Sequence, residues 1–342
     1  MRFTWMKKMI LLLLLVCLPL QAGAESYAAW LPYCKGAEAR EEAQALADKL
    51  DTVIAFAAVF DQKGKPILHD GVEKVLLKAR ETFADRDTKV YISVVNDQQN
   101  GRGYDSKSKS LLEDLLKNDR TIDEHLDELL LILDQSEADG LEIDYENFGS
   151  DEQLYERYVQ LIEQLYAILS RDGLGLRVVM SWRAPQYVTL PEGPEYSVMC
   201  YNLYGNHSGP GPKADINYLQ QVAELWRDVP GTVRMALATG GFLWKNGKVD
   251  LALTQQEAET LLAERGVVPE RNEASGALTA SLIHEGKKAV LWYADGETLN
   301  RWQAELTEFD GIDIFCLGGS NVQDWLNTFL QTDEAAEEER LK

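Results

Sequence analysis

The sequence predicts a (β/α)8 TIM barrel, and three observations lead to this prediction. Short apolar runs alternate with amphipathic helical stretches along most of the chain, a pattern typical of parallel strands joined by right-handed crossovers. There are eight such runs, the number that closes a barrel. The chain has 342 residues, 45% of them hydrophobic, which is enough for one large core. The rival, an open doubly wound sheet, would normally carry a glycine-rich phosphate loop after an early strand, and none is present.

The elements follow one another in the order that a barrel requires. The predicted strands are Ala28–Tyr33, Val53–Phe60, Lys89–Val95, Gly140–Glu146, Leu176–Trp182, Tyr196–Asn202, Val233–Thr239 and Ile312–Leu317. The predicted helices are Glu38–Leu50, Gly71–Phe83, Ser108–Leu116, Thr121–Gln135, Glu152–Ser170, Asn217–Arg227, Thr298–Glu308 and Val322–Leu330. No helical pattern separates the fifth strand from the sixth.

Residues from about 243 to 297 are too many for one crossover and predict a small α+β insertion between strand 7 and helix 7/strand 8. The stretch contains a helical pattern over Thr254–Arg265, which starts with a capping box of Thr254 and Glu257. Strand-like runs follow at Ala280–His284 and Ala289–Tyr293, and Asn246-Gly247 is typical of a hairpin turn. The insertion is either a decorative excursion or a wall that deepens a cleft.

The two ends of the chain differ from the part between them. Residues 1–24 have a positive start, an apolar run over Met9–Leu20 and a small-x-small site at Ala22-Gly23-Ala24, which together predict a signal peptide. An uncleaved anchor is the alternative. We expect one barrel domain over 25–332, in the cell envelope or secreted, and a charged, disordered tail over 333–342.

The net charge of −22 excludes several classes of partner. Removing the leader takes away three positive charges and no negative ones, so −22 becomes −25. Such an acidic protein is not expected to bind nucleic acid or anionic lipid headgroups, and an anionic polymer would need local contacts. The three remaining cysteines, Cys34, Cys200 and Cys316, allow at most one disulfide. No cysteine or histidine spacing suggests a metal, and we expect no cofactor. We also expect a monomer.

The most informative segment is Asp139–Glu146, in which acidic and apolar residues alternate. Glu142, Asp144 and Glu146 would share one face of a strand, roughly 6.6 Å apart. Carboxylates inside a barrel are costly and raise one another's pKa, so the stability of the fold does not explain them. Glu146 comes last, at the C-terminal mouth where barrel enzymes place their chemistry, and is a candidate general acid. A solvated edge strand is the alternative interpretation.

Asp144 does not suit the role of a conventional nucleophile. A retaining pair of carboxyl groups lies about 5–5.5 Å apart on opposite sides of the anomeric carbon. Two residues on one face of one strand approach from the same side, which suits an acid and its modulator. The nucleophile would then come from elsewhere, and a 2-acetamido group on the substrate can supply it.

The segment resembles glycoside hydrolase family 18, whose fourth strand carries Asp-x-x-Asp-x-Asp-x-Glu. Asp139, Asp144 and Glu146 match, and Glu142 stands where the family usually has aspartate. Met199-Cys200-Tyr201-Asn202 is similar to the sixth-strand Met-x-Tyr-Asp. Gly311-Ile312-Asp313-Ile314-Phe315-Cys316-Leu317-Gly318 is similar to the eighth-strand Gly-Ile-x-x-Trp-x-Leu-Gly. The most similar branch is the bacterial cell-wall and spore-cortex-lytic one, without its LysM repeats.

The resemblance implies a role for each matching position. Glu146 would protonate the glycosidic oxygen, and Asp144 would orient the 2-acetamido group and stabilise the oxazolinium ion. Tyr201 would hydrogen-bond the same acetamido group, Asn202 would contact the sugar or Glu146, and Phe315 would form the floor of the −1 subsite. Further candidate substrate contacts are Glu142, Trp182, Met199 and Phe56.

Three departures from the family pattern bear on activity. Glu142 is one methylene longer than aspartate, Asn202 replaces a carboxylate and Phe315 replaces tryptophan. The expected function is a secreted glycosidase that hydrolyses β-linked N-acetylglucosamine glycans, peptidoglycan first, by a substrate-assisted retaining mechanism. The alternatives are a chitinase, an endo-β-N-acetylglucosaminidase that trims N-glycans, and a catalytically weak chitinase-like lectin. Trp182 could stack on sugars, and its neighbour Arg183 could pair with an acidic substituent.

Overall fold

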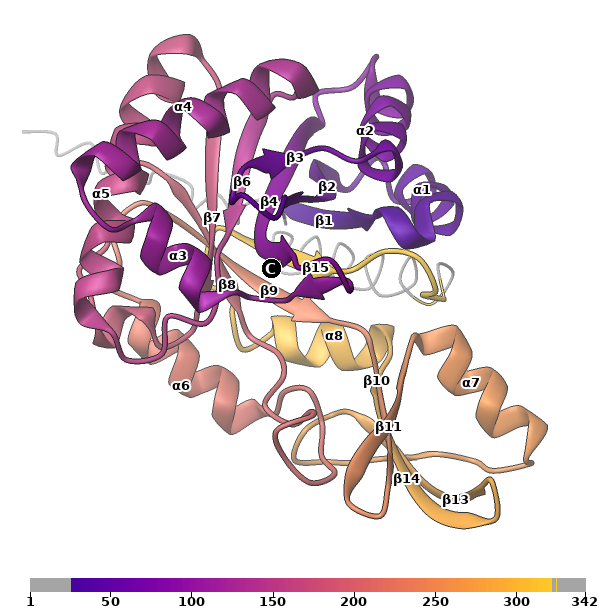
Figure 1. The fold of residues 1–342 in the computed structure, drawn as a ribbon. Helices are drawn as coiled ribbons and strands as arrows, with labels where there is room; N and C mark the ends of the chain where they lie inside the picture. Colours follow the sequence, from indigo (N-terminus) through magenta and orange to yellow (C-terminus); the bar gives the residue numbers. More distant parts are fainter. Residues whose placement is uncertain (1–25, 322–323, 325–342) are drawn as a thin grey trace, which may run out of the picture.

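Eight parallel strands close into a barrel in the computed structural model, which describes residues 26–321 and 324 (Figure 1). Each barrel strand pairs with its neighbours around the ring. The parallel pairing of Leu50–Phe60 with Lys89–Gln99 closes the barrel. The predicted fold class is confirmed. The barrel strands are β1 (Tyr27–Pro32), β2 (Leu50–Phe60), β4 (Lys89–Gln99), β6 (Gly140–Asp144), β7 (Gly175–Ser181), β8 (Glu195–Met199), β9 (Thr232–Ala238) and β15 (Gly311–Phe315).

Helices cover the outside of the barrel and bury the apolar face of each strand. They are α1 (Gly36–Ala45), α2 (Asp70–Phe83), α3 (Lys109–Leu115), α4 (Asp119–Ser136), α5 (Glu152–Leu169), α6 (Ile216–Trp226) and α8 (Gly296–Gln303). Between β7 and β8 the chain forms only a 3-10 turn, Ala184–Gln186, as the missing helical pattern indicated. Of the helix predicted at Val322–Leu330, the structure describes only Asp324.

The strands that carry the predicted site are shorter than expected at their C-terminal ends. β6 ends at Asp144 and β8 at Met199, so Glu146 and Asn202 belong to the loops that follow. Asn147 and Asn202 have φ values of 72° and 63°, a left-handed conformation that asparagine tolerates better than most residues and that turns the chain out of the strand. Two short antiparallel strands, β3 (Pro66–Ile67) and β5 (Tyr104–Asp105), extend β2 and β4 on this side.

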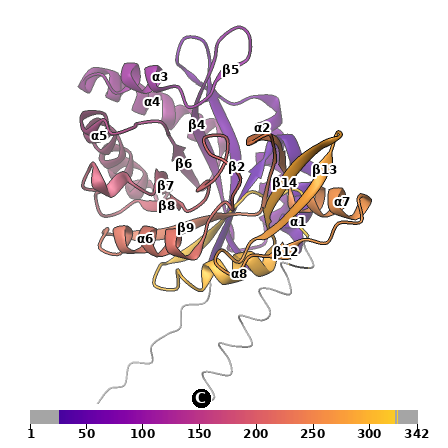
Figure 2. The ribbon, with the colours of Figure 1, turned by 90° about the horizontal axis from the view of Figure 1, so that it is seen from below.

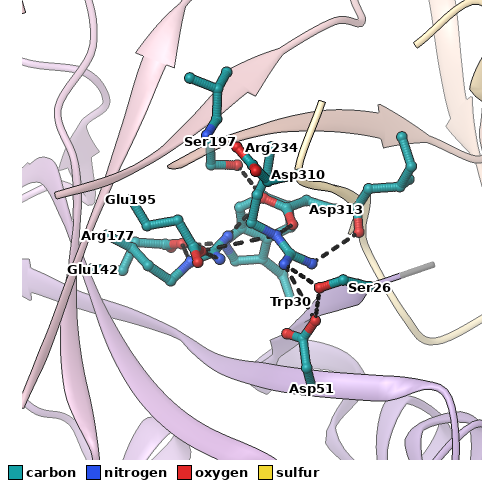
Figure 3. A network of polar contacts seen from close by, with 12 residues as sticks. Ser26, Trp30, Asp51, Glu142, Arg177, Glu195, Ser197, Arg234, Asp310 and Asp313 are labelled. Atoms are coloured by element: carbon teal, nitrogen blue, oxygen red, sulfur yellow. Dashed lines mark hydrogen bonds and ion pairs between the residues drawn. The ribbon is translucent and has the colours of Figure 1, made fainter. Parts of the chain in front are cut away.

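Buried ion pairs occupy the barrel interior near the N-terminal ends of the strands (Figure 3). Arg177 of β7 pairs with Glu142 at 3.1 Å and with Asp313 at 2.6 Å, and Arg234 of β9 pairs with Asp313 at 2.6 Å. Burial alone would raise the pKa of Asp313, but the two guanidinium groups hold it below its ordinary value. Glu195 and Ser197 of β8 complete the contacts of this network with Arg177 and Asp313.

A second, five-stranded antiparallel sheet forms the predicted insertion, at the lower right of Figure 1. Its elements are β10 (Gly240–Lys245), β11 (Lys248–Leu253), α7 (Gln255–Glu264), β12 (Glu270–Arg271), β13 (Leu278–His284) and β14 (Lys287–Ala294). The predicted capping box of Thr254 and Glu257 starts α7, and the turn at Asn246-Gly247 has the two positive φ values expected. Gly241 is required where the insertion leaves the barrel, because a Cβ there would meet the Trp292 carbonyl oxygen at 1.8 Å.

The loop after β15 joins the barrel to this insertion. Glu42 of α1 is buried and accepts hydrogen bonds from the amides of Gly318, Gly319 and Ser320 at 2.7–2.8 Å. On the other side of the same loop, Gln256 of α7 donates from its backbone N–H to the Gly319 carbonyl at 3.0 Å and from its side chain to the Ser320 carbonyl at 2.7 Å. The first helix, the last strand and the insertion therefore meet at one short segment.

The predicted signal peptide, residues 1–24, and the predicted charged tail, 333–342, lie outside the described residues. Within residues 26–321 and at 324, no helix is both long and apolar enough to span a bilayer. Figure 2, seen from below, places the insertion strands β13 and β14 alongside the barrel and opposite the helices α4 and α5.

Candidate active site

The ladder of acids on β6 rises from the barrel interior to its C-terminal mouth. Glu142 is fully buried, Asp144 is 8% exposed, and the side chain of Glu146 is 20% exposed. The apolar residues between them pack outward, where Tyr145 shares a hydrogen bond of 2.8 Å with His125 of α4. The predicted alternation is therefore present, and solvent access increases towards Glu146.

Glu142 does not fit the predicted role of a substrate contact. Its Oε1 accepts a hydrogen bond from the Trp30 indole at 2.7 Å, and its Oε2 accepts one from Arg177 at 3.1 Å. Burial raises the pKa of Glu142, and the positive charge of Arg177 opposes that rise. With no exposed surface and with both oxygens engaged, Glu142 lies below the site and anchors it to the interior network.

Asp144 is a buried carboxyl group with an unused oxygen. Its Oδ1 has no hydrogen-bond partner within the described part of the chain. Burial raises its pKa well above the ordinary value, and the neighbouring carboxylates of Glu146 and Glu142 raise it further. An unpaired buried oxygen is costly unless a bound group or a water satisfies it.

The main chain of Glu146 is clamped by Asn96 of β4. The Asn96 side chain accepts from the Glu146 N–H at 3.0 Å and donates to the Glu146 carbonyl at 3.0 Å. Asn96 is itself buried. The Glu146 carboxylate forms an ion pair with Lys107, at 2.6 Å between Nζ and Oε1. This lysine comes from the loop between β5 and α3.

Aromatic side chains form the floor of the mouth beside these acids. The ring of Tyr201 stacks on that of Phe315, with centroids 5.4 Å apart and planes at 14°. Phe56 and Trp30 meet Phe315 edge-on, at 5.9 Å and 5.7 Å. Burial raises the pKa of the Tyr201 hydroxyl well above its ordinary value, and the negative charges of Asp144 and Glu146 raise it further. The hydroxyl is thus a permanent hydrogen-bond donor close to both acids.

A cavity of about 200 Å³ opens beside Glu146 on the side of β7 and β8. Met199, a predicted substrate contact, is among its lining residues. Its remaining walls are Tyr145, Asn147, Phe148, Gly149, Tyr155, Met180 and Ser181.

Two other predicted residues lie at the edge of this arrangement. Asn202 is exposed. Trp182 packs edge-on against Tyr218 at 5.5 Å, and the Arg183 guanidinium lies over its ring at 4.7 Å. One face of Trp182 is therefore covered by a cation, so a sugar could stack on that face only if Arg183 moved.

Sequence reasoning missed Asn96, Lys107 and the interior arginines. Strand alternation could have shown Arg177 and Arg234, because each lies on the inward face of its strand. Asn96 lies beyond the predicted end of its strand, within β4, and Lys107 approaches Glu146 from the loop between β5 and α3, so neither gave such a signal.

The described residues include one group of side chains that could hold a metal ion. Asp250, His284 and Glu285 lie together at the tips of the insertion hairpins. Lys245 Nζ already pairs with Asp250 at 2.8 Å and with Glu285 at 2.6 Å, so the two carboxylates are neutralised by this lysine. It lies apart from the acids of β6.

Comparison with known proteins gives fold relatives only. No family model and no curated protein matches the sequence. Among solved structures, the spore cortex-lytic enzyme SleL of Bacillus cereus superimposes with a TM-score of 0.72 at 15% identity, over 90% of this chain and 74% of that one. A chitinase from Chromobacterium violaceum gives 0.74 at 14%, and a class V chitinase from Nicotiana tobaccum 0.68 at 12%, each over 90% of this chain and 98% of the other.

The chain has the fold of these enzymes. Because the identities are low, the likeness establishes the shared barrel, and the chemistry rests on the residues. It agrees with the resemblance found in the motifs of β6, β8 and β15, which lie on three separate strands and converge on one mouth.

Proposed function

We propose that the protein is a glycosidase of the family 18 type, exported from the cell, that hydrolyses β-linked N-acetylglucosamine glycans such as peptidoglycan. Support comes from the convergence of Glu146, Asp144, Tyr201 and Phe315 at the C-terminal mouth of the barrel. The fold shared with chitinases and with a spore cortex-lytic enzyme agrees with this substrate class.

The observation that carries the proposal is the unpaired, buried Oδ1 of Asp144 next to Glu146. A substrate amide in this position would relieve the unsatisfied oxygen, which favours a sugar with a 2-acetamido group. By the resemblance, Tyr201 would also hydrogen-bond this acetamido group. The raised pKa of Tyr201 keeps its hydroxyl protonated for that hydrogen bond.

In the proposed reaction, the protonated carboxyl group of Glu146 gives its proton to the glycosidic oxygen as the C1–O bond breaks. The acetamido oxygen attacks C1 and forms the oxazolinium ion, whose positive charge Asp144 stabilises. Glu146, now a carboxylate, takes a proton from water as the water oxygen attacks C1 and opens the ring. Two inversions at C1 retain the configuration, and Glu146 regains its proton.

The test is hydrolysis of N-acetylglucosamine oligomers and of purified peptidoglycan by the wild type and by Glu146→Gln. We expect the variant to lose cleavage, at least about 10²-fold, while it still binds the glycan. A thiazoline analogue of the oxazolinium ion should inhibit the wild type. An unchanged rate in Glu146→Gln would refute the role of the acid, and no inhibition by the thiazoline would refute participation by the acetamido group.

The ion pair between Lys107 and Glu146 favours a second candidate, a chitinase-like lectin. A carboxylate engaged by an ammonium group holds no proton to donate, so the site could bind sugar without cutting it. Glycan binding by the wild type with no product on either substrate would decide for the lectin.

A further inference from the structure

The contact between Lys107 and Glu146 is in conflict with general acid catalysis. The two charged atoms are 2.6 Å apart, and the side chains are 51% and 20% exposed. A general acid must carry a proton when it meets the glycosidic oxygen, whereas this ion pair uses the ionised form. Something must therefore draw the ammonium group away before the reaction proposed above can begin.

The fold builds the main chain of Lys107 into this position. Its φ of 55° is left-handed, which is costly for lysine and has to be held by the surroundings. Its N–H donates to Asp97 Oδ1 at 2.8 Å, and its carbonyl accepts from the Asn147 side chain at 3.0 Å. The next amide, that of Ser108, donates to the carbonyl of Asn96, which also clamps Glu146.

The side chain, in contrast, is free to turn. It is half exposed, and its only ion pair among the described residues is the one with Glu146. A lysine carries a compact charge on a flexible four-carbon stem, so its ammonium group can exchange one carboxylate for another nearby without moving the backbone.

We propose that Lys107 is a specificity-determining residue that selects glycans bearing a carboxylate next to the cleaved bond. The inference rests on the proposed function and names the substrate class of the same site: N-acetylated sugars with a free lactyl ether carboxylate, as in peptidoglycan strands whose stem peptides have been removed. The substrate carboxylate takes over Lys107 and so releases Glu146 from its ion pair.

Charge balance favours this exchange. Before binding, one ammonium and one carboxylate face each other. A substrate carboxylate offers the ammonium group a replacement partner, so the charge of Lys107 stays paired when it leaves Glu146. A neutral glycan offers Lys107 no replacement and leaves it on Glu146. In a protein of net charge −22, a local cation of this kind is needed to hold an anionic polymer.

Three soluble substrates of equal length test the proposal: a neutral N-acetylglucosamine oligomer, an oligomer that alternates with lactyl-bearing sugars, and the latter with its carboxylates amidated. We would measure kcat/KM for the wild type, Lys107→Met and Lys107→Arg. Lys109→Met is the matched control, because that lysine, two residues along, pairs with Asp151 and Glu113 away from Glu146.

The wild type should prefer the carboxylate substrate to its amide by about tenfold or more, the range of a charge-assisted hydrogen bond. Lys107→Met should lose that preference and gain rate on the neutral oligomer, Lys107→Arg should keep most of it, and Lys109→Met should match the wild type. Equal changes on all substrates in Lys107→Met, or a wild type that treats acid and amide alike, would overturn the proposal.

The comparison separates this proposal from the one on which it rests. A wild type that cleaves none of the three substrates refutes the glycosidase function and the selection together. A wild type that cleaves them in a Glu146-dependent manner but without discrimination refutes only the role of Lys107. If Lys107→Met does not fold, the wild-type ratio between the acid and its amide still decides.

Discussion

Asn96 binds both peptide groups of Glu146, accepting from its N–H and donating to its carbonyl, each at 3.0 Å. Glu146 lies just beyond the end of β6, where ladder hydrogen bonds no longer hold the chain. A buried side chain on the neighbouring strand thus replaces the ladder at the point where the acid must be placed accurately. Asn96 is a positioning residue, because it acts through the backbone of Glu146.

We predict that Asn96→Ala lowers kcat by about 10²-fold, since a displacement of about 1 Å at a reacting group costs this much. KM should change little, because the aromatic floor that would hold the sugar makes no contact with Asn96 in its ring packing. Steady-state kinetics on a soluble oligomer would show the split. Asn100→Ala, an exposed asparagine on the following hairpin, serves as control. A rise in KM with kcat intact would contradict a positioning role.

Asp144→Asn should separate stability from activity. The native pKa of Asp144 is raised, so the native state keeps a proton that the unfolded state releases above about pH 4. The contribution of Asp144 to the free energy of unfolding of the wild type therefore falls as pH rises from about 4 towards the native pKa. The variant should not show this fall. Urea unfolding between pH 4 and 8 would measure it. Cleavage by the variant should fall by about 10²-fold. A variant with the same pH slope as the wild type would refute the raised pKa.

For His125 we expect the free energy of unfolding to depend on pH in the opposite direction. Burial lowers its pKa to about 3, while the unfolded chain binds the proton near pH 6.5. Its contribution to stability is complete above pH 6.5 and is lost as pH falls towards 3, by up to about 5 kcal/mol. His125→Gln, which can still reach the Tyr145 hydroxyl, should flatten this slope. NMR titration of the imidazole checks the cause directly, and a native pKa near 6.5 would contradict the prediction.

Arg177→Met should destabilise the barrel by about 3–5 kcal/mol, because it leaves Glu142 and Asp313 as buried carboxylates with less compensation. The double variant with Glu142→Gln should recover part of the loss. Arg157→Met, which removes a surface pair with Asp119, should cost much less. Denaturant unfolding of the four proteins would test this. Equal losses in Arg177→Met and Arg157→Met would show that the interior network contributes no more than a surface pair.

Much of the fold followed from local patterns that tertiary structure does not override. The capping box at Thr254 and the turn at Asn246-Gly247 specify their own geometry, and the alternation in β6 oriented its acids correctly. The exposure of each acid could not be predicted this way. Glu142 looks equivalent to Asp144 in the pattern, and only the depth of the barrel and the position of Arg177 separate a buried anchor from a residue of the mouth.

The position of Lys107 depends on contacts of its loop and not on the pattern of the strands. Lys107 reaches Glu146 because Asp97 and Asn147 hold the backbone of a loop in a left-handed conformation, and no periodicity in the sequence reports this. The covered face of Trp182 likewise depends on the rotamer of Arg183. Both are long, flexible cations whose partners are set by packing.

The joint formed by Glu42 and Gln256 on the loop after β15 has a mechanical consequence. That loop leaves the barrel directly after Phe315, the floor residue, and it is gripped from one side by the first helix and from the other by the insertion. A tilt of the insertion would therefore pull on the chain next to Phe315. We expect that a glycan in contact with the insertion would shift the position of Phe315 at the floor of the mouth, because the shared loop connects the two.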